Sequence, residues 1–431
     1  MDRYAFEGLN VTSGFHIDST FANIELINAA EQIIKQKEDT TWCIGEGGSI
    51  YSTAAVSGNM VFFGCCDKNF YALDADTGKE LWRFSTNGII LSNPFIEGNA
   101  IYFGSFDGNL YALSLGGDLL WRFNAGEAVA MDPIVYNGKV YFGSKNGNFY
   151  CLDARGVLIW KFGTMGPIGA SAGAANGKVF IGSADRNLYA LDAENGSLLW
   201  KFSTDGPIRY YAHVSDGIVY FGSLDGCAYA VSESDGSLVW KYPTGDGVGT
   251  DVPVYGGKAY IGSRDMNCYC VDKKTGRLIW RFNPGSYPDY LSVYDGVAYV
   301  GYCNNVLYAL DDENGKKLWE FRTGGPIVAR PVMHNDKLYF GSWDCNFYCL
   351  SRDGKLVWRS ATSQSSQSRL EPPETSGTFS SEFVASFEED ATKKKEEGQE
   401  RLADYGDEFK SSYAGSMKSN YVAGRRKGYI K

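Results

Sequence analysis

The chain has 431 residues and a formal net charge of −10, with 44% hydrophobic and 15% aromatic residues. The negative charge argues against general nucleic-acid binding by the body of the protein, and no apolar run approaches the roughly 18 to 20 residues that cross a bilayer. With three histidines and no CxxC pair, the sequence also disfavours histidine-based metal sites and zinc or redox sites built on paired cysteines.

Residues 1–40 precede the repetitive part of the chain and form the first predicted region. Between Thr20 and Lys37, apolar residues recur at roughly helical spacing after possible caps at Asp18 and Ser19, which predicts a helix packed on the main domain or on a partner. The segment 1–7 has no basic region followed by an apolar stretch, so we expect no secretory signal and a cytoplasmic location. In that reducing compartment, the ten cysteines are expected to be mostly buried free thiols.

Residues 41–360 contain one pattern written eight times. Tryptophans recur at spacings of 39 or 40 residues, at Trp82, Trp121, Trp160, Trp200, Trp240, Trp280, Trp319 and Trp358. Glycines recur in step with them, at Gly64, Gly104, Gly143, Gly182, Gly222, Gly262, Gly301 and Gly341. A period near 40 residues with four strand-like runs per repeat is typical of a β-propeller. We therefore predict an all-β fold, an eight-bladed β-propeller with four-stranded blades.

The fourth repeat illustrates the predicted blade. A small-residue run, 167–174, is followed by the hairpin signal Asn176-Gly177 and by a strand at 178–183. Two further strands are expected at 188–192 and 197–202, separated by polar turns. We name the four strands A to D from the axis outward, and we expect the strand-D tryptophan to pack between neighbouring blades.

Two segments carry a resemblance to a known family. Asp74–Phe84 and Asp311–Trp319 resemble the tryptophan-docking motif of the PQQ-like (quinoprotein, BamB-type) β-propellers, and the resemblance covers residues 42–359. WD40 repeats fit less well, because no Gly-His and Trp-Asp pairs recur. Ring closure has two solutions, since Thr41–Gly45 is a ninth candidate for strand D. Either Trp42 or Trp358 closes the last blade, and we expect Trp42 to take part.

One position of strand A is strongly polar in most repeats. This polar column consists of Thr53, Asn93, Asp132, Ser171, Tyr211, Asp251, Tyr290 and Arg330. We predict that it faces the central channel. It is either a hydrated pore wall or a small-ligand site. In the second case, Arg209 and Arg330 would anchor an anion. Asp132, Asp251 and Asp289 would then act as acceptors or metal ligands, beside Tyr211 and Tyr290.

The resemblance also implies a quinone cofactor, with a disulfide between adjacent cysteines and a Ca²⁺ ion in the dehydrogenases of this family. Cys65-Cys66 is such a pair, but it takes the place of Ser105-Phe106 in the turn after strand B rather than the channel side. No Ser-His-Asp set, phosphate-binding loop or dinucleotide fingerprint is found. The sequence therefore predicts no catalytic residue, no metal site and no cofactor.

Residues 361–431 change character abruptly. A Ser/Gln-rich linker at 363–368 is followed by a charged stretch and by a basic end without acidic residues after position 410. This tail is either a solvated extension, disordered or partly helical, or a docking segment. The candidate docking residues are Lys418, Tyr421, Arg425, Arg426, Lys427 and Tyr429. An acidic protein surface is the favoured partner, and RNA is the less favoured one.

Two functions from different classes are compatible with these observations. The favoured one is a non-catalytic propeller scaffold that mediates protein–protein interaction or complex assembly, with the tail as a docking segment. The alternative is a PQQ-dependent alcohol or sugar oxidoreductase, which would require PQQ and Ca²⁺. A BamB-like assembly factor matches the repeats equally well, although BamB-like proteins normally carry a lipoprotein signal, which residues 1–19 do not resemble.

Overall fold

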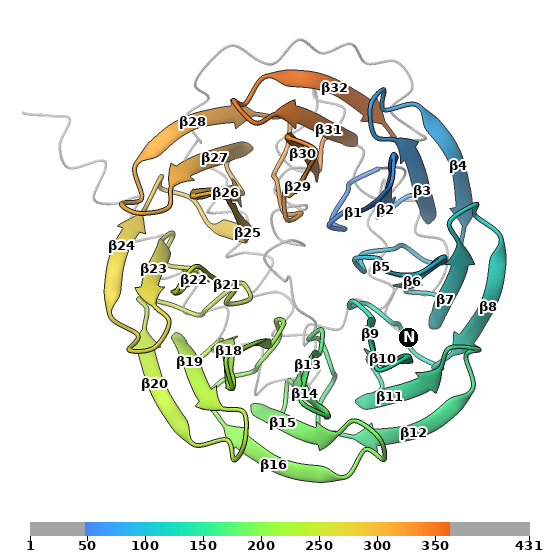
Figure 1. Cartoon of the computed structure of the whole chain (residues 1–431), viewed down its shortest axis with the longest axis vertical. Coiled ribbons are helices and arrows are strands. Elements are labelled where there is room, and N and C mark those ends of the chain that lie inside the picture. Colours follow the sequence, from blue (N-terminus) through green and yellow to red (C-terminus); the bar gives the residue numbers. More distant parts are fainter. Residues whose placement is uncertain (1–47, 363–431) are drawn as a thin grey trace, which may run out of the picture. The chain divides into compact units, whose positions relative to one another are not determined.

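The computed structural model describes residues 48–362, which form eight four-stranded antiparallel sheets arranged around one axis (Figure 1). Within this range every regular element is a strand. The predicted all-β, eight-bladed propeller is therefore confirmed. The predicted helix between Thr20 and Lys37, Trp42 and the tail lie outside the described residues.

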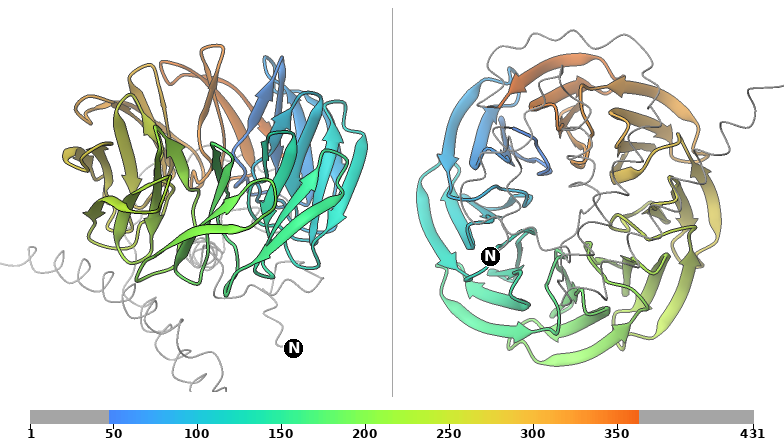
Figure 2. Two further views of the ribbon diagram at one scale, coloured as in Figure 1. Left: turned by 60° about the horizontal axis from the view of Figure 1, so that its bottom comes forward. Right: turned by 180° about the vertical axis from the view of Figure 1, so that it is seen from behind.

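Each blade uses four consecutive strands, ordered from the axis to the rim (Figures 1 and 2). The innermost strands are β1 (Ala55–Ser57), β5 (Phe95–Glu97), β9 (Ile134–Tyr136), β13 (Gly173–Ala175), β17 (His213–Ser215), β21 (Val254–Tyr255), β25 (Pro288–Tyr294) and β29 (Val332–His334). The second strands are β2 (Met60–Gly64), β6 (Ala100–Gly104), β10 (Lys139–Gly143), β14 (Lys178–Gly182), β18 (Ile218–Ser223), β22 (Lys258–Gly262), β26 (Val297–Tyr302) and β30 (Lys337–Gly341).

The third strands are β3 (Asn69–Asp74), β7 (Asn109–Ser114), β11 (Asn148–Asp153), β15 (Asn187–Asp192), β19 (Cys227–Ser232), β23 (Cys268–Asp272), β27 (Val306–Asp311) and β31 (Asn346–Ser351). The outer strands are β4 (Glu80–Ser85), β8 (Leu119–Asn124), β12 (Leu158–Gly163), β16 (Leu198–Ser203), β20 (Leu238–Pro243), β24 (Leu278–Phe282), β28 (Lys317–Arg322) and β32 (Leu356–Ala361). A bulge interrupts the pairing of the third and outer strands in every blade. It leaves the residue before each tryptophan as the extra residue of the outer strand.

The turns follow the sequence signals. Asn176 and Gly177 both have positive φ, 49° and 76°, as the predicted tight hairpin requires. In the next turn of the same blade, Asp185 accepts the backbone N–H of Asn187 at 3.1 Å and the Tyr189 hydroxyl at 2.7 Å. A short polar side chain thus replaces missing backbone partners at this turn.

The hydrophobic core lies between the faces of neighbouring blades. One such cluster combines Phe180 and Leu188 of blade 4 with Val219 and Phe221 of blade 5, all fully buried. Among the cysteines expected to be mostly buried free thiols, Cys151, Cys268, Cys270 and Cys349 of the third strands are buried and free. Alternating apolar residues on both faces of each inner strand are therefore buried by two neighbours at once.

Each seam between blades is fastened by the outer-strand tryptophan, as predicted. The Trp200 indole N–H donates to the carbonyl of Glu233 in the next blade at 3.1 Å, and its ring lies against Gly236. The same contact closes the ring, because Trp358 donates to the Ala75 carbonyl at 3.1 Å. β32 is thus the outer strand of the last blade, so the expected use of Trp42 at this position is wrong.

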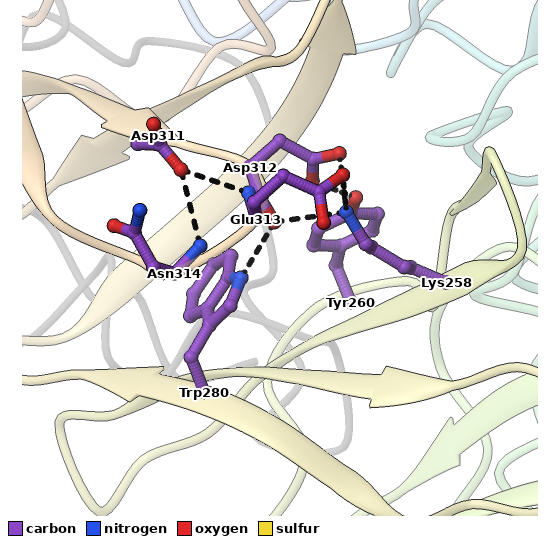
Figure 3. Close-up of polar contacts among 7 residues, drawn as sticks. All are labelled: Lys258, Tyr260, Trp280, Asp311, Asp312, Glu313 and Asn314. Carbon is purple, nitrogen blue, oxygen red and sulfur yellow. Dashed lines mark hydrogen bonds and ion pairs between the residues drawn. The ribbon is translucent and has the colours of Figure 1, made fainter.

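The seam between blades 6 and 7 also contains a buried ion pair (Figure 3). The Lys258 ammonium bonds the Asp312 carboxylate at 2.9 Å and that of Glu313 at 2.7 Å. The other Asp312 oxygen accepts the Tyr260 hydroxyl, and the Asp312 carbonyl accepts the Trp280 indole N–H at 2.8 Å. The charged groups of this cluster are therefore paired and hydrogen-bonded, which offsets the cost of burying them.

Candidate functional site

Members of the polar column are linked from blade to blade. The backbone N–H of Arg330 donates to Thr53 Oγ1 at 3.1 Å, and the N–H of Thr53 donates to Asn93 Oδ1. The N–H of Asn93 in turn donates to Asp132 Oδ1 at 2.8 Å, and that of Asp132 to Ser171 Oγ at 3.3 Å. Five of the eight column members are therefore engaged in linking neighbouring blades, beyond the two roles expected from sequence. The predicted place in strand A is wrong for all members except Tyr290, because the others lie in the segments that precede the innermost strands.

The remaining members, Tyr211, Asp251 and Tyr290, lie around Arg330. Its guanidinium forms an ion pair with Asp251 and lies over the Tyr290 ring, 5.5 Å from the centroid. Arg330 belongs to blade 8 and Asp251 to blade 6, so this contact passes blade 7 on the axis side. The geometry supports the prediction that the column faces the axis. Asp251 is fully buried, whereas 29% of the Arg330 side chain is exposed.

Burial sets the protonation of the groups around this pair. Burial is the strongest single influence on Arg330 and opposes its charge, but Asp251, Tyr290 and Asp132 together outweigh it, so the pKa of Arg330 is raised. Burial raises the pKa of both Tyr290 and Tyr211 and lowers that of His213, which packs edge-on against Tyr211. At neutral pH the Arg330–Asp251 ion pair therefore lies among neutral phenol and imidazole groups. This arrangement suits rigid positioning better than proton transfer.

Asp132 has a different environment from Asp251. Its Oδ2 accepts the Asn93 side-chain amide at 2.8 Å, in addition to the backbone bond of Oδ1. Burial nevertheless raises the pKa of Asp132, partly countered by these bonds and by the charge of Arg330. Both oxygens are thus occupied by the neighbouring blade, which leaves Asp132 poorly placed as a ligand to an added group.

The remaining predicted residues lie beside this network. Asp289, in β25, accepts the N–H of Tyr290 at 2.9 Å, and Arg209 is buried two residues before Tyr211. The pKa of Tyr51 is raised by burial and, to a smaller extent, by charges that include Asp289. The six tail residues proposed for docking lie outside the described residues.

The sequence reasoning missed an aromatic pair near Asp289. Tyr51 packs against Trp343 with ring centroids 4.9 Å apart, and Trp343 is completely buried. Trp343 follows the strand-B glycine by two residues, where other repeats carry residues such as Phe106 or Ala184. The available signal was that this tryptophan lies outside the 39- to 40-residue period.

The family model described as outer membrane protein assembly factor BamB matches residues 30–161, 145–280 and 224–386. The chain belongs to the PQQ-like, BamB-type propeller family. The resemblance inferred from the tryptophan-docking motif is therefore confirmed. No curated protein matches the chain.

Solved structures share the fold of this PQQ-like propeller at low sequence identity. The computationally designed Ika8 protein has a TM-score of 0.65 at 17% identity, covering 70% of this chain and 96% of its own. BamB from Moraxella catarrhalis has a TM-score of 0.61 at 18% identity, covering 68% and 93%. Quinohemoprotein alcohol dehydrogenase from Comamonas testosteroni has a TM-score of 0.58 at 13% identity, covering 70% and 71%. At these identities the likeness concerns the fold alone.

The residues of this propeller fit a PQQ and Ca²⁺ site poorly. Cys65 and Cys66 are free, buried thiols, and Cys65 Sγ lies 3.4 Å from the Gly48 carbonyl oxygen, in the turn after β2. Within residues 48–362, no group of three His, Cys, Asp or Glu side chains is arranged to hold a metal ion. In the same range, no helix is long and apolar enough to cross a membrane.

Proposed function

We propose that this protein is a non-catalytic propeller scaffold for protein–protein interaction or complex assembly. The observation that carries the proposal is the rim of the ring, where every outer strand exposes at least one large aliphatic residue next to its tryptophan. These residues are Leu81, Leu119, Leu120, Leu158, Ile159, Leu198, Leu199, Leu238, Val239, Leu278, Ile279, Leu318, Leu356 and Val357. The bulge before each tryptophan accounts for their repeated exposure.

Such exposure has a physical cost that interaction with a partner would remove. Each of these side chains keeps roughly half of its surface in water, as for Leu120 at 52% and Leu199 at 46%. Apolar surface returns about 25 cal/mol per Å² when it is covered, so a partner that spans two blades gains several contacts of this kind. The basic tail residues, Lys418 to Tyr429, remain a second candidate docking segment.

The oxidoreductase alternative draws on the family and on the solved alcohol dehydrogenase of similar fold. Against it stand the occupied polar column and the position of Cys65 and Cys66. Arg330, one of the two predicted anion anchors, is already paired with Asp251. Assembly of proteins is the role named for the BamB family, which favours the scaffold.

One experiment separates the two functions. Purified full-length protein is incubated with PQQ and Ca²⁺, and reduction of an electron-acceptor dye by alcohols and aldoses is followed. In parallel, full-length protein and a version ending after Thr362 are used to capture partners from native extract. Thr362 must be retained, since its hydroxyl donates to the Gly48 carbonyl at 3.1 Å. A stoichiometric partner without turnover is the expected result, and enzyme-like turnover would overturn the proposal.

A further inference from the structure

The rim of blade 3 departs from the rest of the ring. Val157, Leu158 and Ile159 are consecutive, and they are 57%, 42% and 44% exposed. In the other repeats, the residue three before the tryptophan is polar or charged: Lys79, Asp118, Ser197, Ser237, Arg277, Lys316 and Lys355. Blade 3 alone has a valine there. Met165, two residues past the end of β12, is 93% exposed.

This run lies at a free sheet edge. β12 is the last strand in the order β12-β11-β10-β9, so within the described residues its outer side has no strand partner. A free edge presents a row of backbone donors and acceptors to any other extended chain, and proteins commonly protect such edges with charged residues. The polar residue that serves this purpose in the other blades is replaced by Val157. Within residues 48–362, all eight outer strands are free edges with exposed aliphatic residues, and blade 3 differs from the others because the polar residue beside the edge is missing.

The charges beside the edge indicate what kind of chain fits. Lys161 is an exposed residue of β12, and Arg155 lies in the preceding turn with 85% of its side chain exposed. Arg155 contacts Asp153 at 3.0 Å, and Lys161 is exposed to solvent. A second copy of this chain would bring two further cations to the same seam, which is unfavourable. Acidic side chains would complement the edge.

We propose that β12 binds an extended segment of a partner protein, in which aliphatic residues alternate with Asp or Glu, by addition of a strand to its free edge. The backbone supplies affinity, while Val157, Leu158 and Ile159 receive the aliphatic side chains and Lys161 pairs with an acidic one. This inference rests on the proposed scaffold function and names the class of its partner.

The test uses two labelled peptides, one with alternating Val and Glu and a second with Lys in place of Glu, measured by fluorescence polarisation against the full-length protein. The Glu peptide is expected to bind and the Lys peptide to bind at least tenfold more weakly. Ile159→Asp should weaken the Glu peptide at least tenfold. Leu199→Asp is the matched control, because it occupies the same rim position of blade 4 with 46% exposure, and it should leave binding unchanged.

A second measurement reports the mode of binding. Backbone amides of β12 should gain protection from hydrogen exchange when the Glu peptide binds, whereas contact through side chains alone leaves them unprotected. Undetectable binding, equal binding of both peptides, or equal effects of the two variants would overturn the inference. So would a concentration-dependent dimer that Ile159→Asp abolishes, since that result identifies a second copy as the occupant.

The inference and the proposed function fail in different ways. If the Ile159→Asp protein captures the same partner from extract as the unmodified protein, docking at β12 is wrong while the scaffold function stands. If turnover with PQQ and Ca²⁺ appears, the scaffold function is wrong whatever the peptides do.

Discussion

The seam contact between tryptophan and glycine gives a sharp quantitative prediction. Gly236 has φ of 72°, and a Cβ atom added there would lie 2.7 Å from Cε3 of Trp200. Gly217 has almost the same φ, 74°, but a Cβ atom there would meet nothing within 4 Å. Gly236→Ala and Gly217→Ala therefore impose the same backbone strain and differ in one contact across the seam.

The two costs can be worked out separately. A Cβ atom in left-handed backbone costs about 1–2 kcal/mol, of which about 0.4–1 kcal/mol is offset because alanine lowers the entropy of the unfolded chain. Gly217→Ala should thus cost about 1 kcal/mol. Gly236→Ala must also displace the Trp200 ring, and overpacking of this kind costs about 1–3 kcal/mol more. The difference between the variants isolates that second amount.

The assay is urea unfolding of both variants and the parent, followed by far-UV circular dichroism at one temperature. Equal slopes with a lower midpoint for Gly236→Ala would attribute the whole effect to stability. Should the two variants agree within about 0.5 kcal/mol, the reasoning that the tryptophan-glycine contact fastens the seam would be refuted.

Three further predictions follow from the same geometry. Trp280→Ala removes a residue that is 6% exposed, together with its hydrogen bond to the Asp312 carbonyl. The free energy of unfolding should fall by about 3–5 kcal/mol. A change below about 1 kcal/mol in urea unfolding would contradict the burial of Trp280. Arg330→Gln leaves the carboxylate of fully buried Asp251 without its cation, which should lower the free energy of unfolding by about 3 kcal/mol. The double variant with Asp251→Asn should recover most of that loss in the same assay. Burial lowers the pKa of His213, so the unfolded chain takes up a proton at this residue before the folded protein does. The contribution of His213 to stability is therefore complete above about pH 6.5 and is lost as the pH falls through the lower folded-state pKa. A His213→Gln protein whose stability falls equally steeply with decreasing pH would contradict this assignment.

The architecture could be predicted from sequence because each blade repeats the same local instructions. Trp200, the hairpin at Asn176 and Gly177, and the turn residue Asp185 each act over a few residues or against the next blade, and the structure places them as predicted. The prediction of how the ring closes was wrong because two segments, one with Trp42 and one with Trp358, carry equivalent strand signals. Only the pairing of β32 with β31 decides between them, and that pairing has no local signature.

Aligning the repeats predicts which residues of the candidate site vary, but not which residues they contact. The residues of the polar column could be found from sequence because they occupy one position of each repeat. The partners could not, because Arg330 passes the neighbouring blade to reach Asp251, and this distance depends on the diameter of the ring. Likewise, the hydrogen bonds that link Thr53, Asn93, Asp132 and Ser171 use backbone N–H donors, which every residue except proline carries, so the sequence does not reveal them.

In a ring of equal blades, residues that obey the repeat are explained by the fold, and departures from it demand a separate explanation. The residue type in the polar column varies from blade to blade, but most of its members form hydrogen bonds or ion pairs within the ring. These contacts account for the variation. Val157 also departs, replacing a polar rim residue with an exposed valine, and no contact within the described residues accounts for the change. An exposed aliphatic run at a free sheet edge makes a monomer prone to aggregation. Its presence is therefore best explained by a segment that covers it, which is why β12, rather than the axis, is the surface to test first.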